Sequence, residues 1–154
     1  MRLADLVDRR RVAASLGARG KLEALNELAA LLSAGQAQIT PQEFCQVLID
    51  RERLRSTGVG SGVAIPHGKV PGLRRLTMAV GLSRRGIEFE AADGRPVQIF
   101  MALAAPVTSA GDHLKALARI ARLCNDPAFR ERLLECRTND EVYEVLVEED
   151  EARR

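Results

Sequence analysis

Hydrophobic residues recur at helical spacing in two early segments of the chain. Between Arg19 and Leu32, leucine and alanine residues fall three or four positions apart, which is typical of a helix that buries one face. Thr40, followed by Pro41 and then Glu43, has the sequence of a capping box with proline at the first helical position. A second helix is therefore predicted from residue 41 to about residue 54.

The C-terminal third of the chain carries the same helical spacing. It predicts three helices, at about Asp112–Cys124, Pro127–Leu134 and Asn139–Val147. The last of these begins in "TNDEVYEVL", where either Thr138 or Asn139 can serve as the N-cap.

Short apolar runs between the helical segments predict strands. In chain order they are Arg11–Leu16, Val63–Ile65, Leu76–Leu82 and Val97–Ala104, with Ile87–Phe89 as a further segment that can pair with its neighbours. The run before Pro66 ends there because proline lacks a backbone donor. The two longest runs are continuously apolar, which indicates burial on both faces of a sheet. Helices at both ends of the chain around a central sheet predict an α/β sandwich.

Composition limits the class of protein. The chain has 154 residues, 46% apolar and 29% charged, which fits one globular domain with an ordinary core. Its 23 basic and 21 acidic residues are interspersed, so a concentrated basic face for nucleic acid is not expected. No run approaches the roughly 18 to 20 apolar residues that span a bilayer, and the N-terminus lacks a signal-peptide core. A cytoplasmic protein without membrane insertion is expected.

The sequence predicts no metal site and no nucleotide cofactor. Its three cysteines are isolated and form no C-x-x-C pair, and Cys45 and Cys124 fall within helical patterns as small buried residues. A P-loop closing at Gly68 would need a glycine in place of Val63 and a serine or threonine in place of Val70. A dinucleotide fingerprint that starts at Gly58 or Gly60 lacks its third glycine. The glycines at 58, 60 and 62 are instead expected to form a loop in which positive φ costs little.

A candidate nucleophile lies in "SGVAIPHGKV", residues 61 to 70. His67 follows the predicted strand, Pro66 fixes its approach, and Gly68 leaves room beside the ring. A neutral imidazole, whose pKa is near 6.5, can attack an electrophile at pH 7 without a strong base. The alternative is an ordinary turn residue that happens to titrate.

The second histidine, His113, falls in the first turn of a predicted helix. Ser109 and Asp112 form an S-x-x-D start signal, although Asp112 can alternatively be the cap itself. Free N–H groups at a helix start favour a nearby anion and disfavour a protonated imidazole. A capping or half-buried histidine remains the alternative.

Arg51 ends the second predicted helix just before the glycine-rich loop. A guanidinium there can offer a fork of donors to phosphate. Basic residues also commonly finish helices, and charge alone does not separate Arg51 from Arg53 or Arg55.

Three stretches together resemble a known family. "RERLRSTGVGSGVAIPHGKV", "DGRPVQIFMALAAP" and "DHLKALARIARL" are similar to the IIA domains of the bacterial phosphoenolpyruvate-dependent phosphotransferase system. The resemblance is to the fructose/mannitol type, nitrogen-regulatory branch, and it is weakest in the first thirty or so residues. It implies a mixed five-stranded sheet flanked by helices on both faces. It also implies a single domain over residues 1–154, with the motif-bearing part at about 8–149.

The resemblance also implies roles for individual residues. It implies that His67 accepts a phosphoryl group on its outer nitrogen from the histidine of a small phosphocarrier protein, without metal or cofactor. It implies that His113 faces His67 and that Arg51 is the active-site arginine. The corresponding phosphate-site loop comprises Ser56, Thr57 and Gly68.

Two hypotheses for the purpose of the transfer stay open. One is a regulator that binds target proteins according to its phosphorylation state; the other is a phosphocarrier in sugar uptake that passes the group to a cysteine of a IIB domain. The length leaves no room for a IIB domain and no membrane segment is present, which favours the regulator. Val63, Ile65, Pro66 and Gly68 are expected to ring the site as a partly apolar surface that a partner covers.

Overall fold

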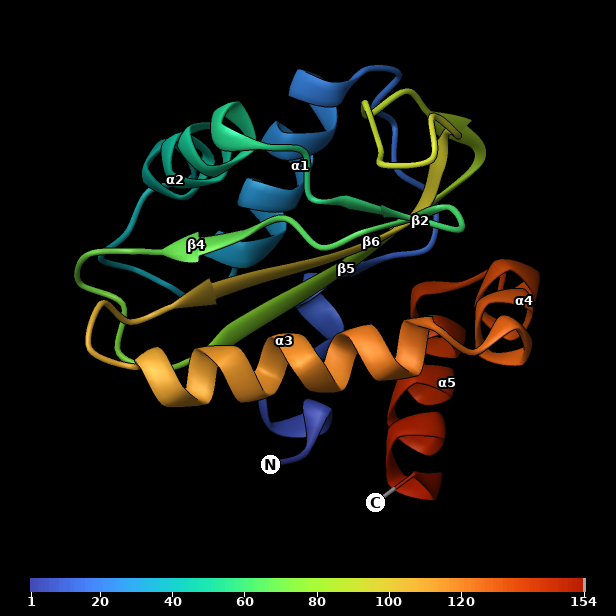
Figure 1. Cartoon of the computed structure of the whole chain (residues 1–154). Coiled ribbons are helices and arrows are strands. Elements are labelled where there is room, and N and C mark those ends of the chain that lie inside the picture. The colour runs from blue at the N-terminus through green and yellow to red at the C-terminus, as the bar shows by residue number, and fades with distance from the viewer. Residues whose placement is uncertain (154) are drawn as a thin grey trace.

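A computed structural model describes residues 1–153, which form a central sheet with helices on both faces (Figure 1). Helices α1 (Lys21–Ser33) and α2 (Pro41–Leu54) cover one face. Helices α3 (Ala110–Cys124), α4 (Pro127–Glu135) and α5 (Asn139–Ala152) cover the other, together with the short 3-10 helix η1 (Leu3–Asp5). The α/β sandwich predicted from the order of elements is confirmed.

The sheet is mixed, and its longest strands lie at its centre. Its order is β1 (Val12–Ala13), β5 (Thr77–Ile87), β6 (Val97–Ala105), β3 (Val63–Ala64) and β2 (Gly58–Gly60). Strand β6 pairs antiparallel with β5 and parallel with β3. A further short strand, β4 (His67–Lys69), continues along the same edge of β6 beyond β3. Six strands thus occupy five positions, as expected for a mixed five-stranded sheet.

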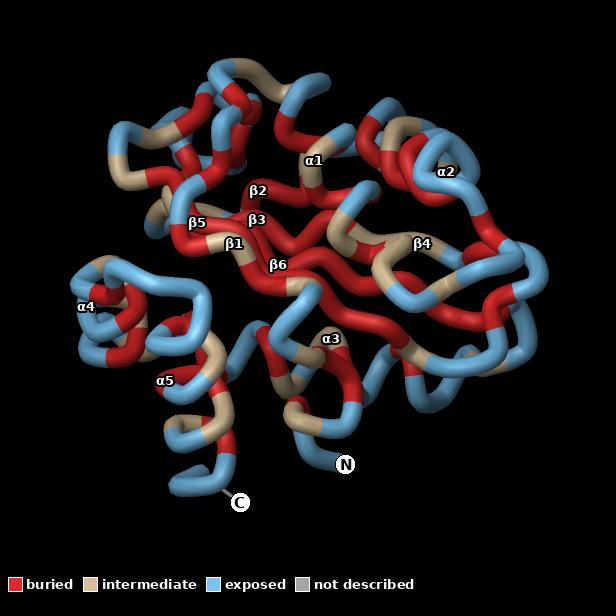
Figure 2. Tube along the Cα trace, turned by 180° about the vertical axis from the view of Figure 1, so that it is seen from behind, coloured by how far each residue is buried: buried red, intermediate tan, exposed pale blue. Residues whose placement is uncertain are grey.

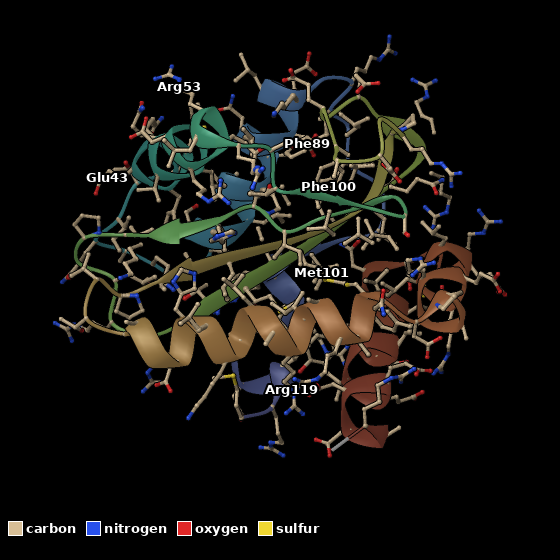
Figure 3. All side chains as sticks on the ribbon, viewed as in Figure 1. Glu43, Arg53, Phe89, Phe100, Met101 and Arg119 are labelled. Atoms are coloured by element: carbon tan, nitrogen blue, oxygen red, sulfur yellow. The ribbon has the colours of Figure 1, made fainter. Side chains whose placement is uncertain are left out.

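The core has two halves, one on each face of the sheet. Along β6, Phe100 and Ala102 pack with α1 and α2, whereas Met101 and Leu103 pack with the C-terminal helices. Figure 3 shows Phe100 and Met101 pointing to opposite faces. Figure 2 shows the same burial along the central strands, with β4 more exposed. Burial on both faces, predicted from the continuous apolar runs, is confirmed.

The capping box predicted at Thr40 and Glu43 is present. The Glu43 N–H donates to Thr40 Oγ1 at 3.2 Å and the Glu43 side chain accepts from the Thr40 N–H. Thr138, not Asn139, caps α5. Helix α5 continues beyond the predicted end because the buried Asp150 accepts hydrogen bonds from the Leu3 N–H and from Arg119 Nε.

Two predictions of local structure need correction. The segment from Gly58 to Gly60 is not a loop but strand β2, which pairs antiparallel with β3. Gly60 and Gly62 do have positive φ, whereas a Cβ at Gly58 would lie 2.7 Å from the Cβ of Ala91, so Gly58 is required by close approach. Ile87 belongs to one long β5 and not to a separate segment.

The cysteines are placed as the sequence predicts, as small buried residues. All three cysteines are free and buried, and burial raises the pKa of Cys124 to about 12. Within residues 1–153, no helix has both the length and the apolar character needed to cross a membrane.

Candidate functional site

His67 follows the predicted strand, as expected, but it also begins a further strand, β4, which was not predicted. Strand β3 ends before Pro66, as predicted. The chain then rejoins the sheet at once, because His67 pairs with Leu103 of β6. The Pro66 carbonyl accepts the Leu103 N–H at 2.9 Å, so even the proline contributes an acceptor to the sheet. The imidazole is therefore presented from a strand while its ring remains partly exposed.

One hydrogen bond fixes the tautomer of His67. Its Nδ1 lies 2.7 Å from the backbone carbonyl oxygen of Ile65. A carbonyl can only accept, so Nδ1 must carry the proton and Nε2 keeps its lone pair. Burial holds the pKa of His67 below its usual value, and Arg51 acts in the same direction, while the bond to Ile65 opposes them. At neutral pH His67 is thus a neutral ring with a free Nε2.

His113 faces His67 from the first turn of α3. The two ring centroids are 5.5 Å apart and the rings meet edge to face, at 70°. His113 is only 8% exposed, and its Nε2 has no hydrogen-bond partner among residues 1–153. Burial lowers its pKa, with His67 and Lys69 contributing in the same direction. An unpaired buried nitrogen costs about 1–3 kcal/mol, so its presence beside His67 points to a group that binds there.

The start of α3 leaves its first N–H groups without a side-chain cap. Ser109 occupies the N-cap position, but its hydroxyl donates to the Pro106 carbonyl at 2.9 Å and makes no capping bond. Asp112 lies inside the helix, so the interpretation of Asp112 as the cap is wrong. Uncapped first-turn N–H groups favour an anion at this end of the helix.

The three candidate arginines at the end of α2 have different surroundings in the structure. The charge of Arg51 lowers the pKa of His67, whereas Arg53 and Arg55 line a groove of about 710 Å³ between α1 and α2. Figure 3 shows Arg53 pointing outward from α2. Arg51 Nη1 donates to the Arg55 carbonyl at 2.8 Å, which stabilises the end of the helix. Of the three arginines, Arg51 is the one whose charge reaches His67.

Ser56 and Thr57 shape the loop that follows Arg51. Ser56 Oγ donates to the Phe89 carbonyl at 2.9 Å and accepts the Gly58 N–H at 3.1 Å. Thr57 is buried, and its hydroxyl donates to the carboxylate of Glu52. Both hydroxyls are thus occupied in holding the loop, and direct contact of this loop with phosphate stays a prediction.

Gly68 is required for a reason other than the predicted room beside the ring. A Cβ at Gly68 would lie 2.4 Å from Cγ1 of Val47, so the space is already filled by α2. The absence of a side chain at Gly68 lets α2 pack against β4, and this brings the end of α2 close to His67.

Sequence reasoning missed one member of this region, Glu52. Its carboxylate is buried beneath the loop and accepts hydrogen bonds from Thr57. Phe44, Leu48 and Glu52 recur at helical spacing, so the signal was a glutamate in a position on the apolar face.

In this α/β sandwich, His67 at the start of β4 and the buried His113 in the first turn of α3 face each other, as the family resemblance implies. Residues 5–149 match the family described as "Phosphoenolpyruvate-dependent sugar phosphotransferase system, EIIA 2". The chain belongs to this family.

Within the family, nitrogen regulatory proteins are among the relatives of this chain. The chain is 42% identical over 146 residues to the nitrogen regulatory protein of Bradyrhizobium diazoefficiens, and the match covers 95% of each protein. The crystal structure of nitrogen regulatory protein IIA-Ntr from Neisseria meningitidis superimposes with a TM-score of 0.87 at 29% identity, covering 94% of this chain and 98% of that one. The fructose-specific EIIABC component of Bacillus subtilis is 27% identical over 150 residues, which is 97% of this chain but 24% of that protein.

Proposed function

We propose that this protein accepts a phosphoryl group on Nε2 of His67 from a phosphohistidine of a small phosphocarrier protein. The observation that carries the proposal is the bond from Nδ1 to the Ile65 carbonyl, which leaves Nε2 as the nucleophile. The lone pair of Nε2 forms the new N–P bond as the donor's N–P bond breaks, and that electron pair returns to the donor imidazole. The proton stays on Nδ1 during the transfer, so the phosphorylated ring carries a formal positive charge beside the phosphoryl dianion.

The surroundings of His67 suit a dianion. A phosphoryl group brings nearly two negative charges, which need donors and positive potential. Arg51, the unpartnered Nε2 of His113 and the first-turn N–H groups of α3 supply them. Lys69 adds a further positive charge near His113. In this proposal Ser56, Thr57 and Gly68 shape the phosphate site and the reaction uses no metal.

We propose further that the phosphorylation state controls binding to target proteins, in the cytoplasm and as one domain over residues 1–154. The similarity to nitrogen regulatory proteins over nearly their whole length supports this. The expected apolar ring of Val63, Ile65 and Pro66 is wrong, because all three are buried. Val107 and Leu114, which are 53% and 67% exposed near His113, provide the apolar surface instead. A partner that covers this surface would have to desolvate the phosphate, so it should prefer the unphosphorylated form.

The test compares partner binding with onward transfer. The protein is prepared in both forms, and His67→Ala serves as a control that stays unphosphorylated. We expect target proteins to bind the unphosphorylated form and His67→Ala at least tenfold more tightly than the phosphorylated form, a difference of about 1.4 kcal/mol. The alternative is a phosphocarrier in sugar uptake, for which the fructose-specific relative is the specific support. Rapid transfer to a IIB cysteine with sugar phosphate formed, and no partner that distinguishes the forms, would establish the alternative.

Arg51 should tolerate lysine poorly in this reaction. A lysine keeps the charge but loses the planar fork of donors. Loss of a charged hydrogen bond costs about 1.5–3 kcal/mol, so Arg51→Lys should slow phosphoryl transfer by roughly 10- to 150-fold. The matched controls, Arg53→Lys and Arg55→Lys, should transfer at the normal rate. If a control is slow while Arg51→Lys is normal, the role of Arg51 is wrongly assigned.

A further inference from the structure

Glu52 is a buried carboxylate next to the site, and the transfer mechanism gives it no role. It is 7% exposed, and its two oxygens each lie 3.1 Å from the Thr57 nitrogen, whose N–H they accept. The Thr57 hydroxyl donates to the same carboxylate, and Lys21 Nζ forms an ion pair with it at 3.2 Å. A buried charge of this kind persists only when it is paired and hydrogen-bonded, and Glu52 meets both conditions.

Hydrogen bonds connect Glu52 to the imidazole in three steps. Glu52 holds Thr57; the Thr57 carbonyl accepts the Ile65 N–H at 3.0 Å; and the Ile65 carbonyl accepts Nδ1–H of His67 at 2.7 Å. Thr57 and Ile65 are both buried, so water cannot readily replace either bond. The position of the carbonyl that selects the tautomer therefore depends on where Glu52 holds Thr57.

We propose that Glu52 is a positioning residue for His67, which acts through Thr57 and Ile65 to keep the proton on Nδ1 and the lone pair on Nε2. The charge of its neighbour Arg51 acts on His67. In this proposal, consecutive residues of α2 therefore serve the charge of the phosphate and the geometry of the nucleophile. The charge of Glu52 also raises the pKa of His67, against the stronger effect of burial. The part of this inference that concerns the transfer rate rests on the proposed function, whereas the tautomer does not.

The decisive measurement is a ¹H–¹⁵N spectrum of the imidazole nitrogens in the unphosphorylated protein. In the wild type the Nδ1–H tautomer of His67 should dominate. Glu52→Ala leaves the buried Thr57 N–H unpaired, and the ratio of Nδ1–H to Nε2–H should fall about tenfold. Glu52→Gln keeps an acceptor but loses the charge and the partner of Lys21, so a smaller fall is expected. Thr57→Ser keeps the hydroxyl that donates to Glu52, so its spectrum should stay close to that of the wild type. Thr57→Val loses this hydroxyl, so its ratio of Nδ1–H to Nε2–H should fall.

Asp150→Asn is the matched control. Asp150 is also a buried carboxylate that accepts a backbone N–H and pairs with a cation, but it lies in α5 against Leu3 and Arg119. It should lower stability without changing the His67 tautomer, which separates positioning from a merely structural role. Phosphoryl transfer from a phosphohistidine carrier should be about 10- to 100-fold slower in Glu52→Ala, as for carboxylates that orient metal-bound histidines.

The outcomes distinguish the two proposals. The positioning role is overturned if the His67 tautomer is unchanged in folded Glu52→Gln and Thr57→Val. The same result is required of Glu52→Ala if that variant folds. This conclusion holds even if transfer proceeds normally. If the variants shift the tautomer but the wild-type protein accepts no phosphoryl group, the positioning role stands and the proposed function is overturned. Shifts of equal size in Asp150→Asn would show a general effect of lost stability and would also overturn the positioning role.

Discussion

His67→Ala is expected to accept no phosphoryl group from a phosphorylated histidine carrier. The substitution removes the proposed nucleophile, Nε2 of His67, whose lone pair stays free because Nδ1 is bound to the Ile65 carbonyl. Loss of a covalent nucleophile reduces a reaction on the order of 10⁴-fold or more. Intact mass and acid lability of the label measure the result, since an N–P bond is labile in acid. His113→Ala, which keeps His67, serves as the control and should still become labelled when given time.

The pH dependence of the same residue provides a second check. Burial lowers the pKa of His67, so the neutral, nucleophilic ring should persist as the pH falls below about 6.5 and disappear only as the pH falls through the lower pKa. A titration of the His67 nitrogens by NMR measures this directly. A titration midpoint of His67 above pH 6.5 would refute the description of its ring as neutral. In the labelling experiment, normal acid-labile labelling of His67→Ala would refute His67 as the phosphorylated residue.

Local patterns predicted much of the fold. Thr40 and Glu43 form their capping box with contacts that lie within one turn, so the sequence alone defines it. The apolar run of β6 is buried on both faces as expected, because continuous hydrophobicity leaves no solvent face. His67 and His113 were candidates from their own positions in the sequence. The family resemblance then implied that these two residues, far apart in the chain, face each other, as their rings do.

Features that depend on long-range packing could not be read in the same way. The short strand that begins at His67 exists because β6 offers an edge there, which no local signal around Pro66 reveals. Gly68 suggested open space beside the ring, but Val47 of another element fills that space. Glu52 has the spacing of a core residue, and only the fold shows that Thr57 and Lys21 compensate its charge.

His113→Ala is expected to fold and yet to transfer phosphate slowly. The His113 Nε2 is buried without a partner in the described part of the chain, so its polar group adds nothing to the stability of the free protein. In the proposed function, the phosphoryl group is the partner of this nitrogen. By analogy with the loss of one oxyanion donor, the variant should lose about 2–4 kcal/mol of transition-state stabilisation, or roughly 30- to 1000-fold in rate.

The unfolding free energy separates this explanation from damage to the fold. Removal of the imidazole loses packing but also removes an unpaired buried nitrogen, so the net change should stay within about 2 kcal/mol. His113→Asn keeps a short N–H donor and should recover part of the rate without a matching change in stability. Leu114→Ala, at the exposed neighbouring position, should leave the chemical step unchanged once the carrier is saturating. A normal single-turnover rate in His113→Ala would remove His113 from the mechanism, and the unpaired nitrogen would then need another ligand to explain it.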